Sequence, residues 1–213
     1  PQGNATSGIG IDKYSLEGCF YDVLINGEPV NHHILPTQVP GLDLVPATLQ
    51  LAGAEVEMVA LESREYLVRR ALEPVRDRYD YILIDCPPSL GLLTVNAFTA
   101  ADTYLIPVQC EYYALEGLSL LLRTLDSIRK SLNPDLQLEG ALLTMYDSRT
   151  NLSDQVKDEI QAYFKDKMFR SVIPRNIRLA EAPSYGLPIS LYDPRSKGAQ
   201  AYYDLAKEVM ANG

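Results

Sequence analysis

The stretch Tyr79–Ser89, with the sequence YDYILIDCPPS, decides the fold that we expect for this chain. Tyr81–Ile84 is an uninterrupted apolar run, which is typical of a strand covered on both faces. Pro87–Pro88 cannot donate the backbone hydrogen bonds that would continue a ladder. We therefore expect the strand to end just before them, with Asp85 at its carboxyl tip.

A carboxylate at a strand tip has two interpretations. In open α/β sheets, ligands bind at the carboxyl ends of the strands, and an Asp there can hold Mg²⁺, directly or through water, beside the phosphates of a nucleotide. The alternative is that Asp85 only caps the turn that follows. The local pattern alone does not decide between them.

Length and composition favour one globular domain over residues 1–213. The chain has 213 residues, 46% of them hydrophobic, which is enough for one substantial core. Its net charge of −9 argues against a surface coated with basic residues and against non-specific binding to anionic membranes. A local basic patch remains compatible with this balance.

The cysteines and the apolar stretches favour a soluble, cytosolic protein. Cys19, Cys86 and Cys110 have no regular spacing, which indicates reduced thiols and not a disulfide framework. No apolar stretch approaches the roughly 20 residues that span a bilayer, and no leader opens the chain. The pair His32–His33 lacks a Cys or carboxylate at ligand spacing, so we interpret it as structural or solvated.

Strands and helices alternate along the rest of the chain. We expect strands at 42–45, 103–108, 138–144 and 169–173, with an edge segment within 30–35, and a polar loop at 1–8. We expect helices at 19–24, 63–79, 92–100, 115–131, 153–166 and 196–210, with a helical turn at 178–184; Ser63 and Ser153 are the expected N-caps. This order predicts an α/β fold with a mostly parallel, doubly wound sheet and helices on both faces.

Five stretches together resemble one family. They are PQGNATSG (1–8), DYILIDCPPS (80–89), PVQCEYYALEGL (107–118), LTMYDSRTNLSDQV (143–156) and IPRNIRLAEAPSYG (173–186). In this order they resemble the ParA/Soj-type chromosome or plasmid partitioning ATPases, in the deviant Walker group that includes MinD. The resemblance covers the whole chain and implies a P-loop NTPase-like fold.

One feature of that family has no counterpart in these residues. Its phosphate loop, of the type Lys-Gly-Gly-Val-Gly-Lys-Thr, precedes the PQGN segment by a few dozen residues, and its switch I Asp stands just before it. Neither occurs in the 213 residues. Because such a loop cradles the phosphates, we expect this chain to be a fragment without its first strand, with weak nucleotide binding and no activity on its own.

The resemblance implies roles for the nucleotide site. Asp85 matches the Walker B aspartate, the catalytic residue that acts on Mg²⁺ through water, and Pro87 would belong to a switch that responds to the γ-phosphate. Gly3 and Asn4 would belong to switch I. Near the adenine we expect Met145, Pro174 and Asn176, although a core methionine and a strand-end turn would explain the same residues.

A second set of residues concerns other macromolecules. Arg149 and Arg178 match positions that the family uses to bind DNA without sequence preference, although each could be a salt-bridged surface group. Arg175, Lys197 and Lys207 could extend the patch. After the strand at 103–108, Glu111, Tyr112 and Tyr113 are expected near the nucleotide or the partner subunit, or as a helix cap with half-buried tyrosines.

The function implied is that of an ATP-hydrolysing partitioning switch. ATP and Mg²⁺ would join two copies into a homodimer, the dimer would bind the nucleoid in the cytoplasm, and a ParB-type partner would stimulate hydrolysis. The alternatives are a positioning ATPase for another cargo, a MinD-like membrane regulator, and a non-catalytic binding module. We expect no membrane binding, because residues 201–213 contain one Lys balanced by Asp204 and Glu208.

Overall fold

The computed structural model describes residues 1–111 and 114–212, with only the backbone described at 114–116. The chain divides into two compact units. The first contains residues 1–101, 128–134 and 183–187; the second contains residues 102–127, 135–182 and 188–213. That the 213 residues fold as one domain stays a prediction.

A parallel three-stranded sheet forms the centre of the second unit. Its strands are β3 (Thr103–Gln109), β4 (Gln137–Tyr146) and β5 (Met168–Pro174), in the order β3-β4-β5. Both neighbouring pairs run parallel. These strands confirm the predictions at 103–108, 138–144 and 169–173 and the α/β class. Their carboxyl ends meet at one edge of the sheet, which is the edge that positions the residues discussed below.

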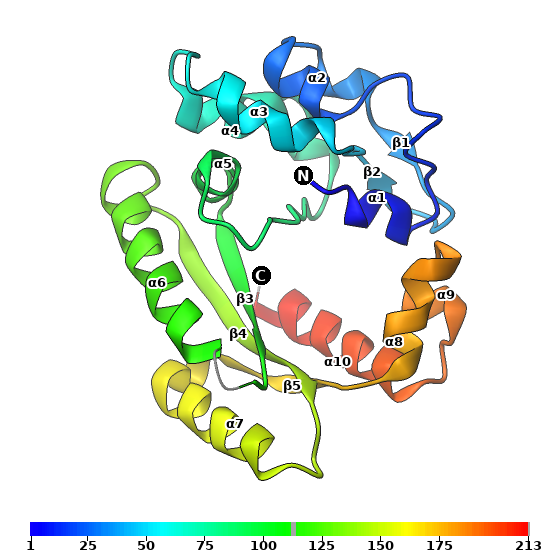
Figure 1. Cartoon of the computed structure of the whole chain (residues 1–213), viewed down its shortest axis with the longest axis vertical. Coiled ribbons are helices and arrows are strands. Elements are labelled where there is room, and N and C mark those ends of the chain that lie inside the picture. Colours follow the sequence, from blue (N-terminus) through cyan, green and yellow to red (C-terminus); the bar gives the residue numbers. More distant parts are fainter. Residues whose placement is uncertain (112–113, 213) are drawn as a thin grey trace. The chain divides into compact units, whose positions relative to one another are not determined.

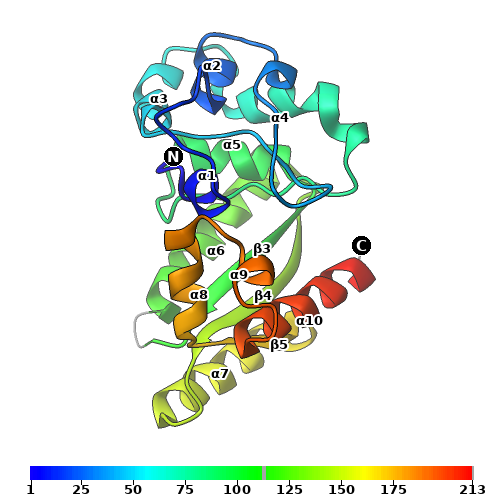
Figure 2. The ribbon, with the colours of Figure 1, turned by 90° about the vertical axis from the view of Figure 1, so that its right-hand side faces the viewer.

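Helices cover both faces of this sheet (Figure 1). On one face lie α6 (Ala114–Ser131) and α7 (Asn151–Phe164), and on the other lies α10 (Lys197–Asn212). Figure 2 shows α10 alongside β5. The short helices α8 (Ile177–Glu181) and α9 (Ile189–Tyr192) follow β5, and a 3-10 turn, Lys165–Lys167, precedes it.

The alternation of side chains along β4 explains this layering. Ala141 and Leu143 are both 0% exposed, and Leu142 between them packs with residues of β5 and α10 on the opposite face. That cluster contains Phe169, Ile173 and Leu205. Because successive residues of β4 are buried on alternate faces, residues 141–143 are apolar at every position, as expected for a strand covered on both faces.

The outer strand β5 has part of its free edge covered by α10. Glu208 accepts hydrogen bonds from the backbone N–H groups of Arg170 and Ser171, at 2.8 and 2.7 Å, and from the Ser171 hydroxyl. The register with β4 is irregular between Ala141 and Leu143 at this point. The carboxylate therefore satisfies donors that an irregular edge strand would otherwise leave exposed.

The first unit is mainly helical. Its α-helices are α1 (Asn4–Gly8), α2 (Phe20–Ile25), α3 (Gln50–Met58), α4 (Leu67–Leu72) and α5 (Leu92–Ala100). Its 3-10 segments are Val30–His32, Arg64–Tyr66 and Glu73–Arg78. A further 3-10 segment, Ala182–Tyr185, belongs to this unit from Pro183 onward. Two short strands, β1 (Leu35–Pro36) and β2 (Asp43–Leu44), pair antiparallel. Leu24, Leu51, Ala54, Met58, Val68 and Leu93 form its main buried cluster.

The predicted strand at Tyr81–Ile84 is wrong for this structure. Among the described residues, no ladder pairs 79–87 with another segment. Tyr81 is 52% exposed and Leu83 88% exposed, so the run is not covered on both faces. A strand is a property of two segments, because its backbone donors and acceptors need a partner, and an apolar run alone cannot provide one.

Several other local predictions need correction. The helix expected at 63–79 is α4 between two 3-10 segments, because Pro74 disfavours an uninterrupted α-helix. Ser63 caps nothing through its side chain, and the cap of α7 is Thr150, whose side chain accepts from the Ser153 backbone N–H. The loop expected at 1–8 contains α1, and the edge segment expected within 30–35 begins with the 3-10 segment Val30–His32. Helices α3 and α9 were not predicted.

A buried amide joins α5 to the segment that leads into α4. Asn96 is 0% exposed; its Nδ2 donates to the carbonyls of Arg64, at 2.7 Å, and Leu92, at 3.0 Å. Its Oδ1 accepts from the backbone N–H of Val68 at 3.1 Å. Each bond satisfies a backbone group that the fold removes from water, so this amide should contribute strongly to stability.

Replacing Asn96 by Ala should lower the free energy of unfolding by about 2–4 kcal/mol, because buried backbone groups lose their partners. Urea unfolding followed by circular dichroism measures the change. The control is Asn212→Ala at the exposed end of α10, which should change stability by less than about 0.5 kcal/mol. Equal midpoints for the two variants would contradict the role given to Asn96.

Candidate functional site

In the first unit, the segment around Gly3 and Asn4 has a constrained backbone. Gly3 has φ of 67°, in the left-handed region, and stands immediately before α1. A Cβ added there would lie 2.2 Å from the carbonyl oxygen of Ala47. Only glycine satisfies both the backbone angle and this close approach. Asn4 is exposed and its amide donates to Gln2 Oε1 at 3.3 Å.

A buried threonine fixes this segment to the start of α3. Thr6 is 1% exposed; its hydroxyl donates to the carbonyl of Ala47 at 3.1 Å and accepts from the Ala47 backbone N–H at 2.9 Å. Lys13 Nζ donates to the carbonyl of Gln2 at 2.8 Å. The switch I segment implied by the resemblance is thus held by contacts within its own unit.

Asp85 follows a residue that packs against the core of the first unit. Ile84 packs against the main buried cluster of the first unit, whereas Asp85 is exposed and Pro87 is partly buried. Within the described residues, the Asp85 carboxylate makes no hydrogen bond and no ion pair. The side chain is therefore not engaged in a structural contact, and no capping bond supports the alternative that it only caps a turn.

Glu55 is a residue near this segment that sequence reasoning missed. Its Oε1 accepts from the backbone N–H of Leu93, at 3.2 Å, in the first turn of α5, which follows the Pro87–Pro88 segment. Thr94 also donates to the carbonyl of Ser89 at 2.7 Å. A carboxylate complements the positive end of a helix dipole. No local sequence signal identifies Glu55, because its contact with Leu93 joins two helices that are distant in the sequence, and α3 itself was not predicted.

The donor chemistry at Asp85 fits Mg²⁺. This ion prefers hard oxygen ligands, keeps several waters and is usually held by one or two carboxylates together with substrate phosphates. One exposed and unpaired carboxylate meets that requirement. Among residues 1–111 and 114–212, no three His, Cys, Asp or Glu side chains gather as a metal cage.

In the second unit, the carboxyl ends of the three strands form a charged rim, which we define as residues 109–111, 145–149 and 174–176. Glu111 follows β3 and Arg175 follows β5; Arg175 Nη2 lies 3.3 Å from Glu111 Oε1. The Arg175 backbone N–H also donates to the Tyr146 carbonyl at 2.8 Å. The rim therefore joins the ends of all three strands. Tyr112 and Tyr113 lie outside the described residues.

The three residues expected near adenine belong to this rim. Met145 has a left-handed φ of 55° and is 37% exposed, so it is not the fully buried core methionine of the alternative. Pro174 ends β5. Asn176 caps α8, because its Oδ1 accepts from the Arg178 backbone N–H at 2.8 Å. Their role toward a nucleotide stays a prediction.

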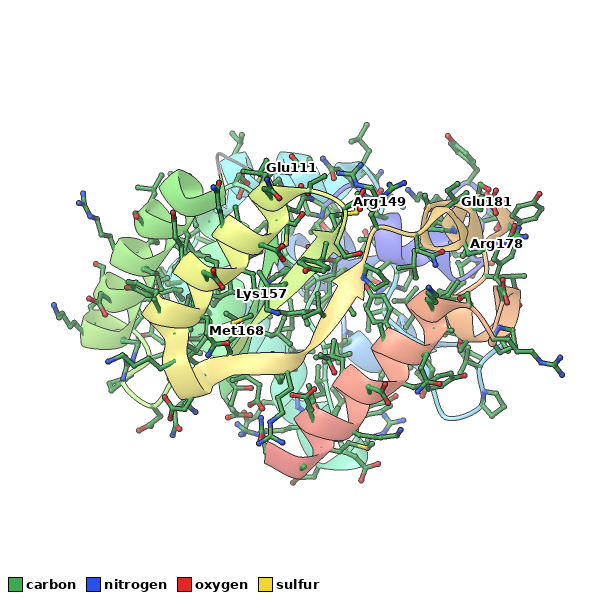
Figure 3. The ribbon with its side chains drawn as sticks, turned by 90° about the horizontal axis from the view of Figure 1, so that it is seen from below. Glu111, Arg149, Lys157, Met168, Arg178 and Glu181 are labelled. Carbon is green, nitrogen blue, oxygen red and sulfur yellow. The ribbon has the colours of Figure 1, made fainter. Side chains whose placement is uncertain are left out.

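Both arginines expected to bind DNA are held by carboxylates; Figure 3 labels Arg149, Arg178 and Glu181. Arg149 Nη2 lies 2.7 Å from Asp147 Oδ2, and Arg149 is 84% exposed. Arg178 is 55% exposed and contacts Glu181 at 3.0 Å and Asp193 at 3.5 Å. The ion pair with Arg149 holds the pKa of Asp147 well below its usual range, first through the side-chain hydrogen bond, and raises the pKa of Arg149.

Two of the other cations named from sequence, Arg175 and Lys207, are also paired with carboxylates. Arg175 is on the rim, as described above. Lys207 pairs with Asp204, at 3.0 Å, on α10, and Lys197 is the first residue of that helix. A further cation, Lys157 on α7, lies 5.9 Å from the centre of the Tyr146 ring, in cation–π range. Figure 3 shows Lys157 projecting from α7.

Comparison with known proteins identifies the family. A family model described as an AAA domain matches residues 1–138. The sporulation initiation inhibitor protein Soj of Bacillus subtilis (strain 168) is 62% identical over 213 residues, which are 100% of this chain and 84% of that protein. The chain belongs to the Soj/ParA family.

A second relative agrees with this assignment to the Soj/ParA family, and a solved structure supports the fold. The chromosome partitioning protein ParA of Myxococcus xanthus (strain DK1622) is 54% identical over 210 residues, covering 99% of this chain and 74% of that protein. A crystal structure of cobyrinic acid a,c-diamide synthase from Mycobacterium smegmatis, with bound ADP and magnesium, has a TM-score of 0.83 and 36% identity over 97% of this chain and 77% of its own. The resemblance to partitioning ATPases and the α/β fold are confirmed.

Gly3→Ala should destabilise the protein by about 1–3 kcal/mol, because the left-handed backbone and the Ala47 carbonyl both exclude a Cβ. The matched control is Gly53→Ala, inside α3, where nothing lies within 4 Å of the added Cβ. That change should stabilise the helix by about 0.5–1 kcal/mol. Thermal unfolding compares the two, and an unaffected Gly3 variant would contradict the constraint.

Proposed function

We propose that this protein is an ATP-hydrolysing partitioning switch in which Asp85 holds Mg²⁺ through water beside the nucleotide phosphates. Family membership supports the reaction class, and the exposed, unpaired Asp85 carboxylate is the observation that carries the residue assignment. Gly3, Asn4 and Pro87 would sense the γ-phosphate, and Met145, Pro174 and Asn176 would contact the base. Mg²⁺ would neutralise charge on the phosphates when bound.

Within the 213 residues, no Gly-rich Lys-Thr loop is available to cradle the phosphates. The proposal therefore includes weak ATP binding and no hydrolysis by this chain alone. Tight ATP binding and ATP hydrolysis should both appear when a Lys-Gly-Gly-Val-Gly-Lys-Thr type loop, with its strand and helix, is joined ahead of Pro1. Activity confined to the longer protein favours an enzyme, whereas inactivity of both favours the non-catalytic binding module.

We further propose that Arg149 and Arg178 bind DNA through its phosphates. Such contacts give affinity without reading sequence, which suits a protein that must bind anywhere on a chromosome. A net charge of −9 means that the basic surface must be local, and an ATP-dependent homodimer would present two copies of it. The protein would then be cytoplasmic and nucleoid-associated, with a ParB-type partner that stimulates hydrolysis.

Two alternatives share part of this proposal. A positioning ATPase for another cargo would use the same residues, and no feature of the chain distinguishes the cargo. A MinD-like regulator would need an amphipathic basic helix, and α10 is charge-balanced near its end, where Lys207 pairs with Asp204. In the described part of the chain, no helix combines the length and apolarity of a membrane span. Co-sedimentation with anionic vesicles separates the two alternatives.

Asp85→Asn in the loop-bearing protein should reduce Mg²⁺-dependent ATP hydrolysis by at least about 100-fold, because a neutral amide holds the metal poorly. Phosphate release assays over a range of Mg²⁺ concentrations measure this. Asp126→Asn, an equivalent change on the exposed face of α6, should leave the rate unchanged. A normal rate in the Asp85 variant would remove Asp85 from the proposed site.

Arg149→Ala and Arg178→Ala should each weaken binding to duplex DNA similarly for unrelated sequences and reduce the slope of log K against log salt by about 1. Fluorescence anisotropy at several salt concentrations gives both quantities. Arg129→Ala, in the exposed last turn of α6, is the control and should have a smaller effect. Equal effects of all three changes would indicate a general charge effect and not a site.

A further inference from the structure

The ion pair of Arg149 occupies one edge of its guanidinium group. Nε donates to Asp147 Oδ1 at 2.9 Å and Nη2 donates to Asp147 Oδ2 at 2.7 Å. The Arg149 backbone N–H also donates to Oδ1, at 3.0 Å, so a short turn aligns the two side chains. Asp147 is 18% exposed and Arg149 84% exposed, which places the carboxylate beneath the outward-facing cation.

Arg178 is held in a comparable way by residues of its own unit. Its Nη1 lies 3.0 Å from Glu181 Oε2, one turn further along α8, and its Nε lies 3.5 Å from Asp193 Oδ2, just after α9. The Tyr192 hydroxyl also donates to Glu181 Oε2 at 3.0 Å and so helps to position that carboxylate. Both arginines of the proposed DNA site thus have an acidic partner from a nearby position in the chain.

These pairs use the chemistry by which arginine recognises phosphate. The planar guanidinium offers parallel N–H donors that match the two oxygens of a carboxylate or a phosphate. At Arg149, the edge formed by Nε and Nη2 is already bound by Asp147. A DNA phosphate must displace that carboxylate or use the remaining donors beside it, and in either case it meets a negative charge.

We propose that Asp147 and Glu181 are intramolecular competitors of DNA phosphate, each occupying a DNA-binding arginine and thereby lowering the affinity of the protein for DNA. This inference rests on the proposed function, because it takes Arg149 and Arg178 as the phosphate-binding residues. Because of this competition, the two arginines do not contribute their full electrostatic attraction when free protein meets DNA. Several phosphate contacts must form before the ion pairs open. The competing carboxylates keep binding weak enough to be reversible.

The charges around Asp147 favour competition. Arg175 lies close enough to lower the pKa of Asp147, after the larger effect of Arg149, so the carboxylate remains ionised at neutral pH. The Asp147–Arg149 pair consequently offers little net charge to an approaching phosphate. If Asp147 instead served mainly to position Arg149, its loss would weaken DNA binding. Whether the loss of Asp147 raises or lowers the affinity for DNA therefore distinguishes the two roles.

The test is Asp147→Asn, measured by anisotropy with a duplex DNA of random sequence at low salt, where weak phosphate contacts are strongest. Asn retains an Oδ1 that can accept from the Arg149 backbone N–H, so the turn should persist. We expect binding about threefold to tenfold tighter than in the parent protein. The matched control is Glu65→Gln, which removes the same charge from the Arg64–Glu65 pair, 3.1 Å apart.

A double-mutant cycle makes the test specific. In an Arg149→Ala background, Asp147→Asn should tighten DNA binding no more than Glu65→Gln does, because the arginine that the change would free for phosphate is absent. Glu181→Gln provides a second, independent variant on Arg178, with the same expected gain. A gain that equals the Glu65 control, or weaker binding, in both variants overturns the inference while leaving the proposed DNA site intact.

The failure of the proposed function has a different signature. If Arg149→Ala and Arg178→Ala leave DNA binding unchanged, the arginines do not contact phosphate, and both the proposed site and the competition are overturned. If these variants weaken binding but the carboxylate variants do not strengthen it, only the competition fails.

Discussion

The parallel pairing of β3, β4 and β5 is the constraint on which the second unit depends. Parallel strands end at the same edge, so residues separated by many positions in the chain are brought together without any local signal. Glu111 and Arg175 are 64 positions apart and meet only because β3 and β5 lie on either side of β4. Helices on both faces bury the strands and leave this edge as the place where charged groups can gather.

The basic side chains of the rim belong to an acidic protein. With a net charge of −9, basic side chains cannot form a broad positive surface, and the arginines of the rim and of α8 are each paired with carboxylates. Exposed ion pairs of this kind contribute little to stability, on the order of 0–1 kcal/mol. Their consequence is therefore greater for recognition than for folding, because a phosphate and a carboxylate compete for the same donors.

Sequence reasoning succeeded where a local apolar pattern also finds its packing or pairing partners in the fold. The helix at Leu92–Ala100 was predicted with its observed bounds, and the strands at 103–108 and 138–144 were predicted to within two residues at each end. The apolar run at Tyr81–Ile84 failed because a strand requires a paired neighbour. Helix α3 was missed because Leu49, Val56 and Val59 are exposed while Leu51, Ala54 and Met58 are buried, which removes the one-sided pattern of a surface helix.

The site was predicted unevenly for the same reason. Asp85, Arg149 and Arg178 could be named because short motifs carry them, but their surroundings depend on tertiary contacts. The bond from Glu55 to Leu93 joins positions 38 apart, and the left-handed Gly3 depends on its contact with Ala47. By contrast, Asp147 stands only two positions before Arg149, so this pair could have been suspected from sequence.

The most direct test of the central claim is whether DNA covers Arg149 and Arg178. Labelling with an arginine-selective dicarbonyl reagent, followed by peptide mass spectrometry, measures the accessibility of each guanidinium with and without duplex DNA. DNA should protect Arg149 and Arg178 from labelling and leave the labelling of Arg64 and Arg129 unchanged. Protection of Arg64 and Arg129 with continued labelling of Arg149 and Arg178 would contradict this claim.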